Sequence, residues 1–292
     1  MNTASIAERA RYLKIAAIPI SEGMRAGGFR SCFRGQGIEF AGVREYERGD
    51  DIRSIDWNVT ARSGKPFVKL YLEERELSVF LVVDNSFSMN SGSASVSRRD
   101  KALEAAALIA FAAAQNASPV GSVVFDGITG TLLKLSAGKD QILTVLSSLE
   151  KHTAQIPGSA LAGAIAGASR VLRSRSLVVL LSDFRTSGYE QALGILSSKH
   201  DVLAIRITAP FDLALPQAGY IPFKDPESGH IASFPTNASA FRDDWEKEHR
   251  ENLDRWQHIC LRRGVSPLVL PVDSDAVKVL SLFFSGRRDG RR

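Results

Sequence analysis

Residues 80–90 read Phe-Leu-Val-Val-Asp-Asn-Ser-Phe-Ser-Met-Asn, an apolar run that stops abruptly at polar side chains. The apolar part is typical of a buried strand, and Asp84, Ser86 and Ser88 follow it directly. At the carboxyl end of a central parallel strand, this spacing lets one carboxylate and two hydroxyls converge on one divalent cation. Further coordination positions are left for water or another molecule. The stretch therefore predicts a parallel sheet with a cation site at its edge.

Asp and Ser after a strand also have an ordinary role, because their side chains accept hydrogen bonds from backbone N–H groups in loops and at helix starts. For these residues alone, capping and cation binding are equally good interpretations. A second segment favours the cation site. Residues 177–181, Leu-Val-Val-Leu-Leu, indicate another buried strand, and it ends in Ser182 and Asp183. Two strands that deliver an aspartate to the same edge of a sheet favour a metal site.

A third contribution is expected from Ser159, which precedes a helix of small residues predicted over 160–173. Its alternative role is the N-cap of that helix, which the sequence supports equally well. A phosphotransferase site of the haloacid-dehalogenase type is excluded. That chemistry needs a second Asp two residues after the first, and position 86 is Ser.

Length and composition indicate a globular α/β protein. The 292 residues suffice to bury a sizeable core, and 44% of them are hydrophobic and 24% charged. Cys32 and Cys260 lie far apart without the spacing of metal ligands, which favours neither a disulfide nor a zinc site. No apolar run approaches the roughly 18 residues of a bilayer span, and the first residues do not resemble a signal peptide. We therefore expect a cytoplasmic protein without a transmembrane segment.

The formal net charge of +5 comes partly from a basic tail that holds Arg287, Arg288, Arg291 and Arg292. No basic stripe interleaved with aromatic residues accompanies this tail, so no nucleic-acid partner is expected.

From residue 77 onward, strand and helix patterns alternate as in a doubly wound, mainly parallel α/β sheet. Ser97 with Asp100 predicts a capping box at the start of a buried helix over 101–116. Strands are predicted over 77–83, 120–125, 131–135, 177–181, 202–207 and 267–272. Further helices are predicted over 139–151, 160–173, 189–198 and 276–284.

The prolines between residues 210 and 238 preclude a central strand, and Asp-Pro-Glu-Ser-Gly at 225–229 has turn chemistry, so a protruding hairpin is predicted. A long amphipathic helix with Phe241, Trp245 and Trp256 follows and ends near Gly264. The expected organisation comprises, in chain order, an N-terminal helical segment (1–27), a small β-rich element (28–76), the main domain (77–286) with a hairpin excursion at about 210–238, and a basic tail (287–292).

The small β-rich element contains a polar stretch, Gly-Asp-Asp-Ile-Arg-Ser-Ile-Asp-Trp-Asn, at residues 49–58. This stretch and its surroundings resemble the domain of unknown function 58 family, and the resemblance covers most of the chain. The motifs that carry it are Glu39-Phe40, Arg44-Glu45-Tyr46, Gly49-Asp50-Asp51, Arg53, Ile55-Asp56-Trp57-Asn58, Ala61-Arg62, Val68-Lys69, Glu73-Glu74, Asp84-Asn85-Ser86-Phe87-Ser88-Met89, Ser182-Asp183-Phe184 and Phe283-Phe284.

That resemblance implies a von Willebrand factor A-like (Rossmann-like) domain with a metal-ion-dependent adhesion site, preceded by a small β element. The positions that match the family's ligands are Asp84, Ser86, Ser88, Ser159 and Asp183. The chain departs from the family pattern in two places, because Ser159 stands where Thr is usual and Ala160 replaces a commonly polar residue. Many relatives also carry membrane-spanning segments before the β element, and this sequence shows none there.

Relatives are commonly associated with AAA+ ATPases of the MoxR type, which implies an adaptor or assembly role. The all-oxygen ligand set favours Mg²⁺, with Mn²⁺ or Ca²⁺ as alternatives. The leading hypothesis is that the ion keeps one position open for an Asp or Glu of a partner protein. The alternative is a divalent-metal-dependent hydrolase in which the ion activates water. Familiar hydrolase motifs are absent and His152 alone lies in the loop leading to Ser159, so no catalytic residue is predicted.

The charged stretch 49–62 has two interpretations, since it holds Asp50, Asp51, Arg53, Asp56 and Arg62. The first is a network of ion pairs and turns that joins the β element to the main domain. The second is an additional surface for a partner protein.

Overall fold

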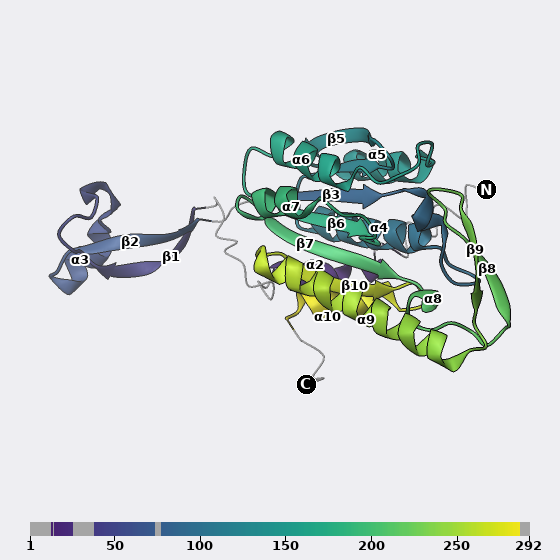
Figure 1. Ribbon diagram of the computed structural model, residues 1–292. Coiled ribbons are helices and arrows are strands. Elements are labelled where there is room, and N and C mark those ends of the chain that lie inside the picture. The colour runs from purple at the N-terminus through teal and green to yellow at the C-terminus, as the bar shows by residue number, and fades with distance from the viewer. Residues whose placement is uncertain (1–12, 14, 26–37, 74–76, 287–292) are drawn as a thin grey trace. The chain divides into compact units, whose positions relative to one another are not determined.

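The computed structural model describes residues 13, 15–25, 38–73 and 77–286, and the chain divides into two compact units (Figure 1). The larger unit combines residues 1–30 with 78–292, and the smaller unit comprises residues 31–77. Residues 1–12 of the expected helical segment, the basic tail at 287–292 and Cys32 lie outside the described residues.

The larger unit is built on a six-stranded sheet (Figure 1). Its strands are β3 (Val79–Asp84), β4 (Val120–Phe125), β5 (Thr129–Ser136), β6 (Leu177–Ser182), β7 (Asp201–Thr208) and β10 (Ser266–Pro271). They lie in the order β10-β7-β6-β3-β4-β5, in which β5 is antiparallel to β4 and the other neighbouring pairs are parallel. The predicted doubly wound, mainly parallel α/β fold is confirmed.

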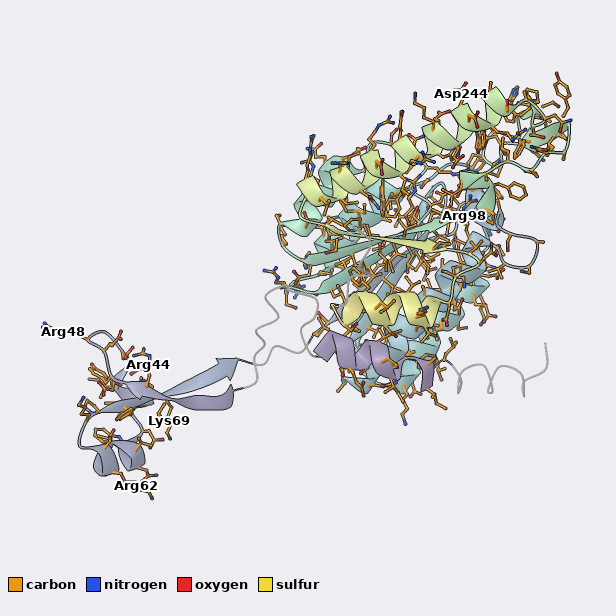
Figure 2. The ribbon with its side chains drawn as sticks, turned by 90° about the horizontal axis from the view of Figure 1, so that it is seen from below. Arg44, Arg48, Arg62, Lys69, Arg98 and Asp244 are labelled. Atoms are coloured by element: carbon orange, nitrogen blue, oxygen red, sulfur yellow. The ribbon has the colours of Figure 1, made fainter. Side chains whose placement is uncertain are left out.

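Helices cover both faces of this sheet, because its central strands are buried on both sides. The helices of the larger unit are α4 (Arg98–Gln115), α5 (Lys139–Lys151), α6 (Leu161–Val171), α7 (Glu190–Ser197), α9 (Ser239–Arg262) and α10 (Ala276–Phe284), with the shorter η2 (Phe87–Asn90) and α8 (Pro210–Leu213). Residues of α6, α7 and α9 share one hydrophobic cluster with alternate strand residues such as Phe80 and Val82. Figure 2 shows α9 on one side of the sheet and α10 on the other.

The predicted capping box of α4 is present. The Ser97 side chain accepts from the backbone N–H of Asp100, and the Asp100 side chain accepts from the N–H of Ser97. This cap fixes the start of the helix that leads away from the end of β3.

The winding of the sheet reverses at β3. The chain continues from β3 to β4 on one side and later returns to β6 on the other side of β3. In open α/β sheets, the crevice at such a switch point, outside the carboxyl ends of the strands, is where ligands bind. The fold therefore places the ends of β3 and β6 where a site is expected.

A short N-terminal helix, α2 (Ile18–Arg25), packs against α4 and α10 of the larger unit. Ile20 and Met24 are buried in this contact, and the Ser21 hydroxyl donates to Asn116 Oδ1 at 3.0 Å. A Cβ at Gly23 would lie 2.8 Å from the backbone carbonyl carbon of Phe284, so the close approach of α2 to α10 requires glycine there.

The predicted hairpin is present as β8 (Tyr220–Lys224) and β9 (Ile231–Pro235), which form a separate two-stranded antiparallel sheet. Phe223 and Phe234 of the hairpin pack against Phe241 and Trp245 of α9, with ring centroids 5.5–6.0 Å apart across the contact. These aromatic residues therefore form a second, smaller cluster rather than part of the main core.

Farther along α9, Trp256 and Cys260 are buried in the main core. Burial raises the pKa of the Cys260 thiol to about 12, so this cysteine is an uncharged packing residue at neutral pH. Gly264, in the left-handed conformation with φ of 69°, ends the helix as the sequence predicted.

The smaller unit consists of an antiparallel pair, β1 (Ile38–Glu45) and β2 (Phe67–Glu73), with the short helices η1 (Ile52–Ser54) and α3 (Trp57–Ser63). Several of its basic side chains are labelled in Figure 2. Asp51 caps η1 and Asp56 caps α3, while Asp50 forms a two-pronged ion pair with Arg44 at 2.7 and 2.8 Å. The acidic residues of the charged stretch thus act locally, in turns and caps within this unit.

Among the helices that the structure describes, none is both long enough and apolar enough to cross a membrane.

Two glycine-to-alanine changes test the contact between α2 and α10. We expect Gly23→Ala to lower the free energy of unfolding by about 1–3 kcal/mol, because the added methyl group overlaps the backbone at Phe284. At Gly167 in α6 an added Cβ meets no atom within 4 Å. Gly167→Ala should therefore raise the free energy of unfolding by about 0.5–1 kcal/mol, because alanine has the higher helix propensity. Urea unfolding of both variants checks this, and equal effects would contradict the described packing.

Candidate metal centre at the carboxyl edge of the sheet

The candidate site begins where β3 and β6 end. Asp84 is the last residue of β3, and Val83 pairs with Leu181, so Asp84 and Ser182 leave the sheet side by side. Asp84, Ser182 and Asp183 are all buried, with 2%, 1% and 4% of their surfaces exposed. Two aspartates therefore lie buried at the same edge of the sheet, the edge that the sequence indicated.

Ser86 and Ser88 lie in the loop directly after β3. Their hydroxyl oxygens are 3.1 Å apart, and Asp84 Oδ1 accepts a hydrogen bond of 2.9 Å from the Ser86 N–H. Although η2 begins after Ser86, the Ser86 hydroxyl makes no capping hydrogen bond. The two hydroxyls are therefore turned toward each other rather than used as caps.

Ser182 positions Asp84, a role that the sequence did not reveal. Its hydroxyl donates to Asp84 Oδ2 at 2.6 Å and accepts from the backbone N–H of Phe184 at 3.0 Å. This one side chain links the end of β6 to the carboxylate at the end of β3. Its position before Asp183 was the only signal in the sequence.

Asp183 has one satisfied and one unsatisfied oxygen. Its Oδ1 accepts from the Arg185 backbone N–H at 3.1 Å, whereas Oδ2 is buried without a hydrogen-bond partner among the described residues. Arg185 Nε lies 3.8 Å from Oδ2, which counts as an ion pair but is too long for a hydrogen bond. A buried carboxylate oxygen without a donor calls for an explanation such as a bound ion or water.

Ser159 also presents a buried oxygen without a hydrogen-bond partner in the described part of the chain. The helix that follows, α6, has Ala160 as its N-cap, so the alternative role of Ser159 as an N-cap is wrong. An unsatisfied buried hydroxyl costs about 1–3 kcal/mol, which a metal ligand recovers when the ion binds.

Asp126, at the end of β4, holds the loop that carries Ser159. Its carboxylate accepts from the backbone N–H groups of Ile128, Gln155 and Ile156 at 3.0, 2.9 and 3.4 Å, and its carbonyl oxygen accepts from the Ala160 N–H at 2.7 Å. The loop therefore has a fixed conformation on both sides of Ser159.

Glu227, in the turn between β8 and β9, contacts two loops of the site. Its Oε1 accepts from the Ser88 N–H at 2.9 Å and its Oε2 accepts from the Gly158 N–H at 2.6 Å. One carboxylate thus spans the two loops that carry Ser88 and Ser159. The sequence indicated only a turn here, and nothing in it placed Glu227 beside residues some 70 and 140 positions away.

The electrostatics of the site favour a cation. Burial and the nearby negative charge of Asp183 raise the pKa of Asp84 to about 7, despite hydrogen bonds from Ser182 and Ser86. Two buried carboxylates repel each other, and a positive ion between them removes that repulsion.

The donor set fits a hard cation such as Mg²⁺, because every candidate atom is oxygen. In the described part of the chain, no group of three or more His, Cys, Asp or Glu side chains could hold a metal ion, so a ligand set at this edge would have to include serine hydroxyls. Hydrogen bonds connect the candidate ligands of the loop after β3 with one another. Ser182 connects Asp84 to the end of β6, which Asp183 follows. Glu227 connects Ser88 to Gly158, the residue before Ser159.

A buried arginine supports the loop after β3. Arg98, 2% exposed, donates to the Ser88 carbonyl oxygen at 3.3 Å, to the Ser91 hydroxyl, and to Asp212 Oδ1 at 2.6 Å. Asp212 also pairs with Arg185. Burial alone would raise the pKa of Asp212, but the guanidinium groups of Arg185 and Arg98 outweigh it and hold this pKa below its ordinary value. The three side chains therefore form a charged network beside the site.

The His152 ring nitrogen Nε2 is buried and has no hydrogen-bond partner among the described residues. This nitrogen lies 3.7 Å from Asp126, and the His152 carbonyl oxygen accepts from Asn85 Nδ2 at 2.6 Å and from Arg99 at 3.0 Å. His152 therefore connects the loop after β3 to the loop that leads to Ser159.

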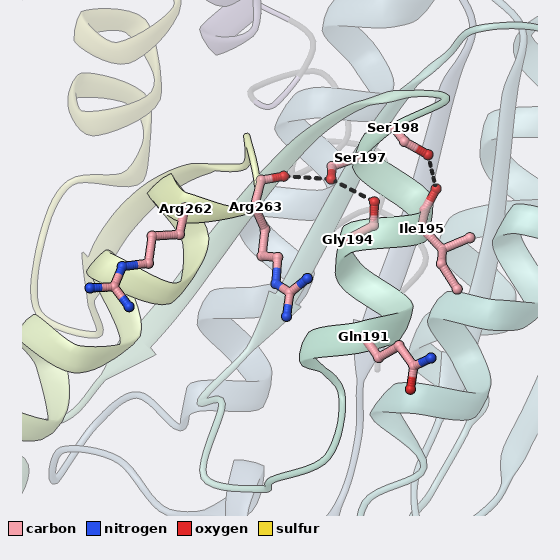
Figure 3. A pocket seen from close by; sticks show the side chains of 7 residues that line it. All are labelled: Gln191, Gly194, Ile195, Ser197, Ser198, Arg262 and Arg263. Carbon is pink, nitrogen blue, oxygen red and sulfur yellow. Dashed lines mark hydrogen bonds between the residues drawn. The ribbon is translucent and has the colours of Figure 1, made fainter.

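A separate surface depression of about 460 Å³ lies between α7 and the end of α9 (Figure 3). It is lined by Gln191, Gly194, Ile195, Ser197, Ser198, Arg262 and Arg263. These residues precede the starts of β7 and β10, so the depression is at the amino edge of the sheet, opposite the candidate metal centre.

A model of the family described as "Protein of unknown function DUF58" matches residues 42–255. Uncharacterized proteins of Mycobacterium tuberculosis and Mycobacterium bovis are each 32% identical to this chain over 292 residues, which cover 98% of this chain and 90% of each relative. The predicted resemblance to the domain of unknown function 58 family is thereby confirmed.

Similar solved structures include the conserved hypothetical protein BatB of Bacteroides thetaiotaomicron, 18% identical with a TM-score of 0.45 over 72% of this chain and 97% of that chain. An aerotolerance-related membrane protein of Bacteroides fragilis is 20% identical with a TM-score of 0.47 over 71% and 96%. A von Willebrand factor type A protein of Catenulispora acidiphila is 12% identical with a TM-score of 0.43 over 74% and 43%. These likenesses concern the fold alone.

Two serines with opposite surroundings test the ligand assignment. Ser159→Ala removes a hydroxyl without partners, so in chelator we expect no loss of unfolding free energy, together with at least a tenfold loss of Mg²⁺ affinity. Ser182→Ala leaves Asp84 and the Phe184 N–H without their partner and should lower unfolding free energy by about 1–3 kcal/mol. Chemical unfolding and calorimetric titration check both; unchanged affinity in Ser159→Ala would contradict the assignment.

The raised pKa of Asp84 predicts a pH dependence of stability in chelator. Because the pKa of Asp84 is about 7 in the folded protein and 3.8 for an ordinary Asp, the folded protein binds more protons between these pH values, and its stability falls as pH rises from about 4 to about 7. Mg²⁺ should restore stability above pH 7, where it no longer competes with the proton. Thermal unfolding at several pH values checks this, and Asp84→Asn should flatten the profile; a flat wild-type profile would contradict it.

Proposed function

We propose that this chain, which belongs to the family of proteins of unknown function DUF58, binds a partner protein through a divalent cation at the carboxyl edge of its sheet. The observation that carries the proposal is the buried oxygen group at this edge, in which Ser159 Oγ and Asp183 Oδ2 lack hydrogen-bond partners among the residues that the structure describes. Buried polar atoms are normally satisfied, so two such atoms beside a carboxylate with a raised pKa support an ion site.

The residues that would hold the ion are Asp84, Ser86, Ser88, Ser159 and Asp183, directly or through water. A bound Mg²⁺ supplies positive charge and an open coordination position for an acidic side chain of the partner. Mn²⁺ and Ca²⁺ accept the same donor atoms.

The surrounding residues act as positioning groups. Ser182 orients the Asp84 carboxylate through a hydrogen bond of 2.6 Å, and Asp126 fixes the loop of Ser159. Arg98 holds the carbonyl oxygen of Ser88. These contacts preorganise the oxygen atoms, which lowers the cost of gathering them around an ion.

We further propose an adaptor role with an AAA+ ATPase of the MoxR type, in the assembly or maturation of other proteins. This part rests on the family resemblance, and a cytoplasmic location belongs to the same proposal. In such a pair, nucleotide hydrolysis belongs to the ATPase, whereas this chain supplies a metal-dependent contact.

The side-chain contacts support binding over hydrolysis. A metal-dependent hydrolase needs a general base near the attacking water. His152, the histidine nearest to Ser159 in the sequence, has its Nε2 buried 3.7 Å from the Asp126 carboxylate, without a hydrogen-bond partner among the described residues. No described contact of the site favours the hydrolase alternative specifically.

Affinity for a purified MoxR-type ATPase should depend on the ion. We expect chelator, or Asp183→Ala in Mg²⁺, to weaken the complex roughly thirtyfold or more, since the partner's carboxylate would then lose its counter-charge. Asp243→Asn, an exposed change on α9, is the matched control and should bind as the wild type does. Calorimetric titration measures all four cases. Equal affinity with and without Mg²⁺ would reject the proposal.

A further inference from the structure

The contact made by Glu227 is unusual for a turn residue. Its carboxylate reaches away from its own hairpin and accepts hydrogen bonds from Ser88 N–H and Gly158 N–H. Ser88 is a candidate ligand, and Gly158 directly precedes the candidate ligand Ser159. An acidic side chain of this chain therefore lies against the loops to which we propose a partner brings its own acidic side chain.

The turn itself is built to present this side chain. Asp225 accepts hydrogen bonds from the backbone N–H of Glu227 at 3.1 Å and from the Ser228 hydroxyl, and its carbonyl oxygen accepts from the Gly229 N–H at 2.8 Å. Asp225 and Ser228 thus satisfy the turn internally. Glu227 is left to make contacts outside the hairpin, and it is half-buried there.

The rest of the hairpin is anchored to α9 rather than to the site. Phe223 and Phe234 pack on Trp245, whose ring N–H donates to the Phe211 carbonyl oxygen at 3.0 Å. In Figure 1 the hairpin runs along the edge of the sheet at which β3 ends. At its tip, the contacts with the site loops described above are the two made by Glu227, so the tip can leave while the aromatic base stays packed.

The segment before the hairpin also contacts the site. The chain enters the excursion through α8, whose Asp212 pairs with Arg98, and Arg98 donates to the Ser88 carbonyl oxygen. The loop that carries Ser88 is thus held from two directions, by Arg98 at its carbonyl oxygen and by Glu227 at its N–H.

We propose that Glu227 is an internal competitor of the partner's carboxylate at the metal site: it holds the loops that carry Ser88 and Ser159, and the partner's carboxylate must displace it. This inference rests on the proposed function and adds the regulation of that site. An internal competitor lowers the apparent affinity for any external carboxylate. The apparent affinity is the intrinsic affinity multiplied by the fraction of molecules in which the hairpin tip is displaced. The hairpin therefore selects partners that also contact the displaced tip or its aromatic base.

The test compares wild type, Glu227→Ala and Glu227→Gln, with Asp243→Asn as the control. Binding of Mn²⁺ is measured first from the loss of the free-ion electron paramagnetic resonance signal. N-acetyl-glutamate N-methylamide, a probe with one carboxylate, is then titrated into the Mn²⁺-loaded protein, and water-proton relaxation reports the displacement of metal-bound water. We expect Glu227→Ala to bind the probe at least tenfold more tightly than wild type, Glu227→Gln to be intermediate, and Asp243→Asn to match wild type.

Amide hydrogen exchange in chelator supplies a readout that does not need the ion. Exchange at the N–H groups of Ser88 and Gly158 should be at least tenfold faster in Glu227→Ala, because both lose their acceptor. Unchanged exchange, or equal probe affinity in wild type and Glu227→Ala, would overturn the inference while Mn²⁺ binding stands. If wild type fails to bind Mn²⁺, the proposed function fails and the inference fails with it. If Glu227→Ala does not fold, Glu227→Gln decides both measurements, with an expected change of at least threefold.

Discussion

The architecture of this edge depends on the burial of two carboxylates at neighbouring strand ends. Asp84 and Asp183 are 2% and 4% exposed, and burial, followed by repulsion from Asp183, raises the pKa of Asp84 to about 7. A fold does not gain stability from such a pair without a counter-charge. The surrounding contacts keep these oxygen atoms together, and in the proposed site a cation would offset the cost in stability.

Loops far apart in the sequence meet at this edge because single polar side chains join them. Ser182 joins β6 to Asp84, Asp126 holds the loop of Ser159, and Glu227 joins that loop to Ser88. Each of these groups lies outside the five candidate ligands. The site therefore has residues at the ends of the sheet strands and one contact from the hairpin. The hairpin itself is held by aromatic packing on α9.

The sheet and the positions of the candidate ligands along it could be predicted from runs such as residues 80–84. In these runs apolar and β-branched residues are followed directly by a polar residue, which marks the carboxyl end of a buried parallel strand. Helix boundaries followed from caps and terminators such as Ser97 and Gly264. The contacts of Ser182 and Glu227 could not be predicted, since they depend on tertiary proximity and have no local pattern. The sequence alone left the N-cap role of Ser159 open; in the structure Ala160 is the N-cap, and the Ser159 hydroxyl has no hydrogen-bond partner among the described residues.

Anomalous diffraction from Mn²⁺-soaked crystals, collected at the manganese absorption edge, tests the central claim most directly. The account predicts one strong peak at the carboxyl edge of the sheet, at coordinating distances of about 2.0–2.6 Å from oxygen atoms of Asp84, Ser86 and Ser88 or from water held by them. A map without a peak at this edge, from crystals in which the same side chains are ordered, would contradict it.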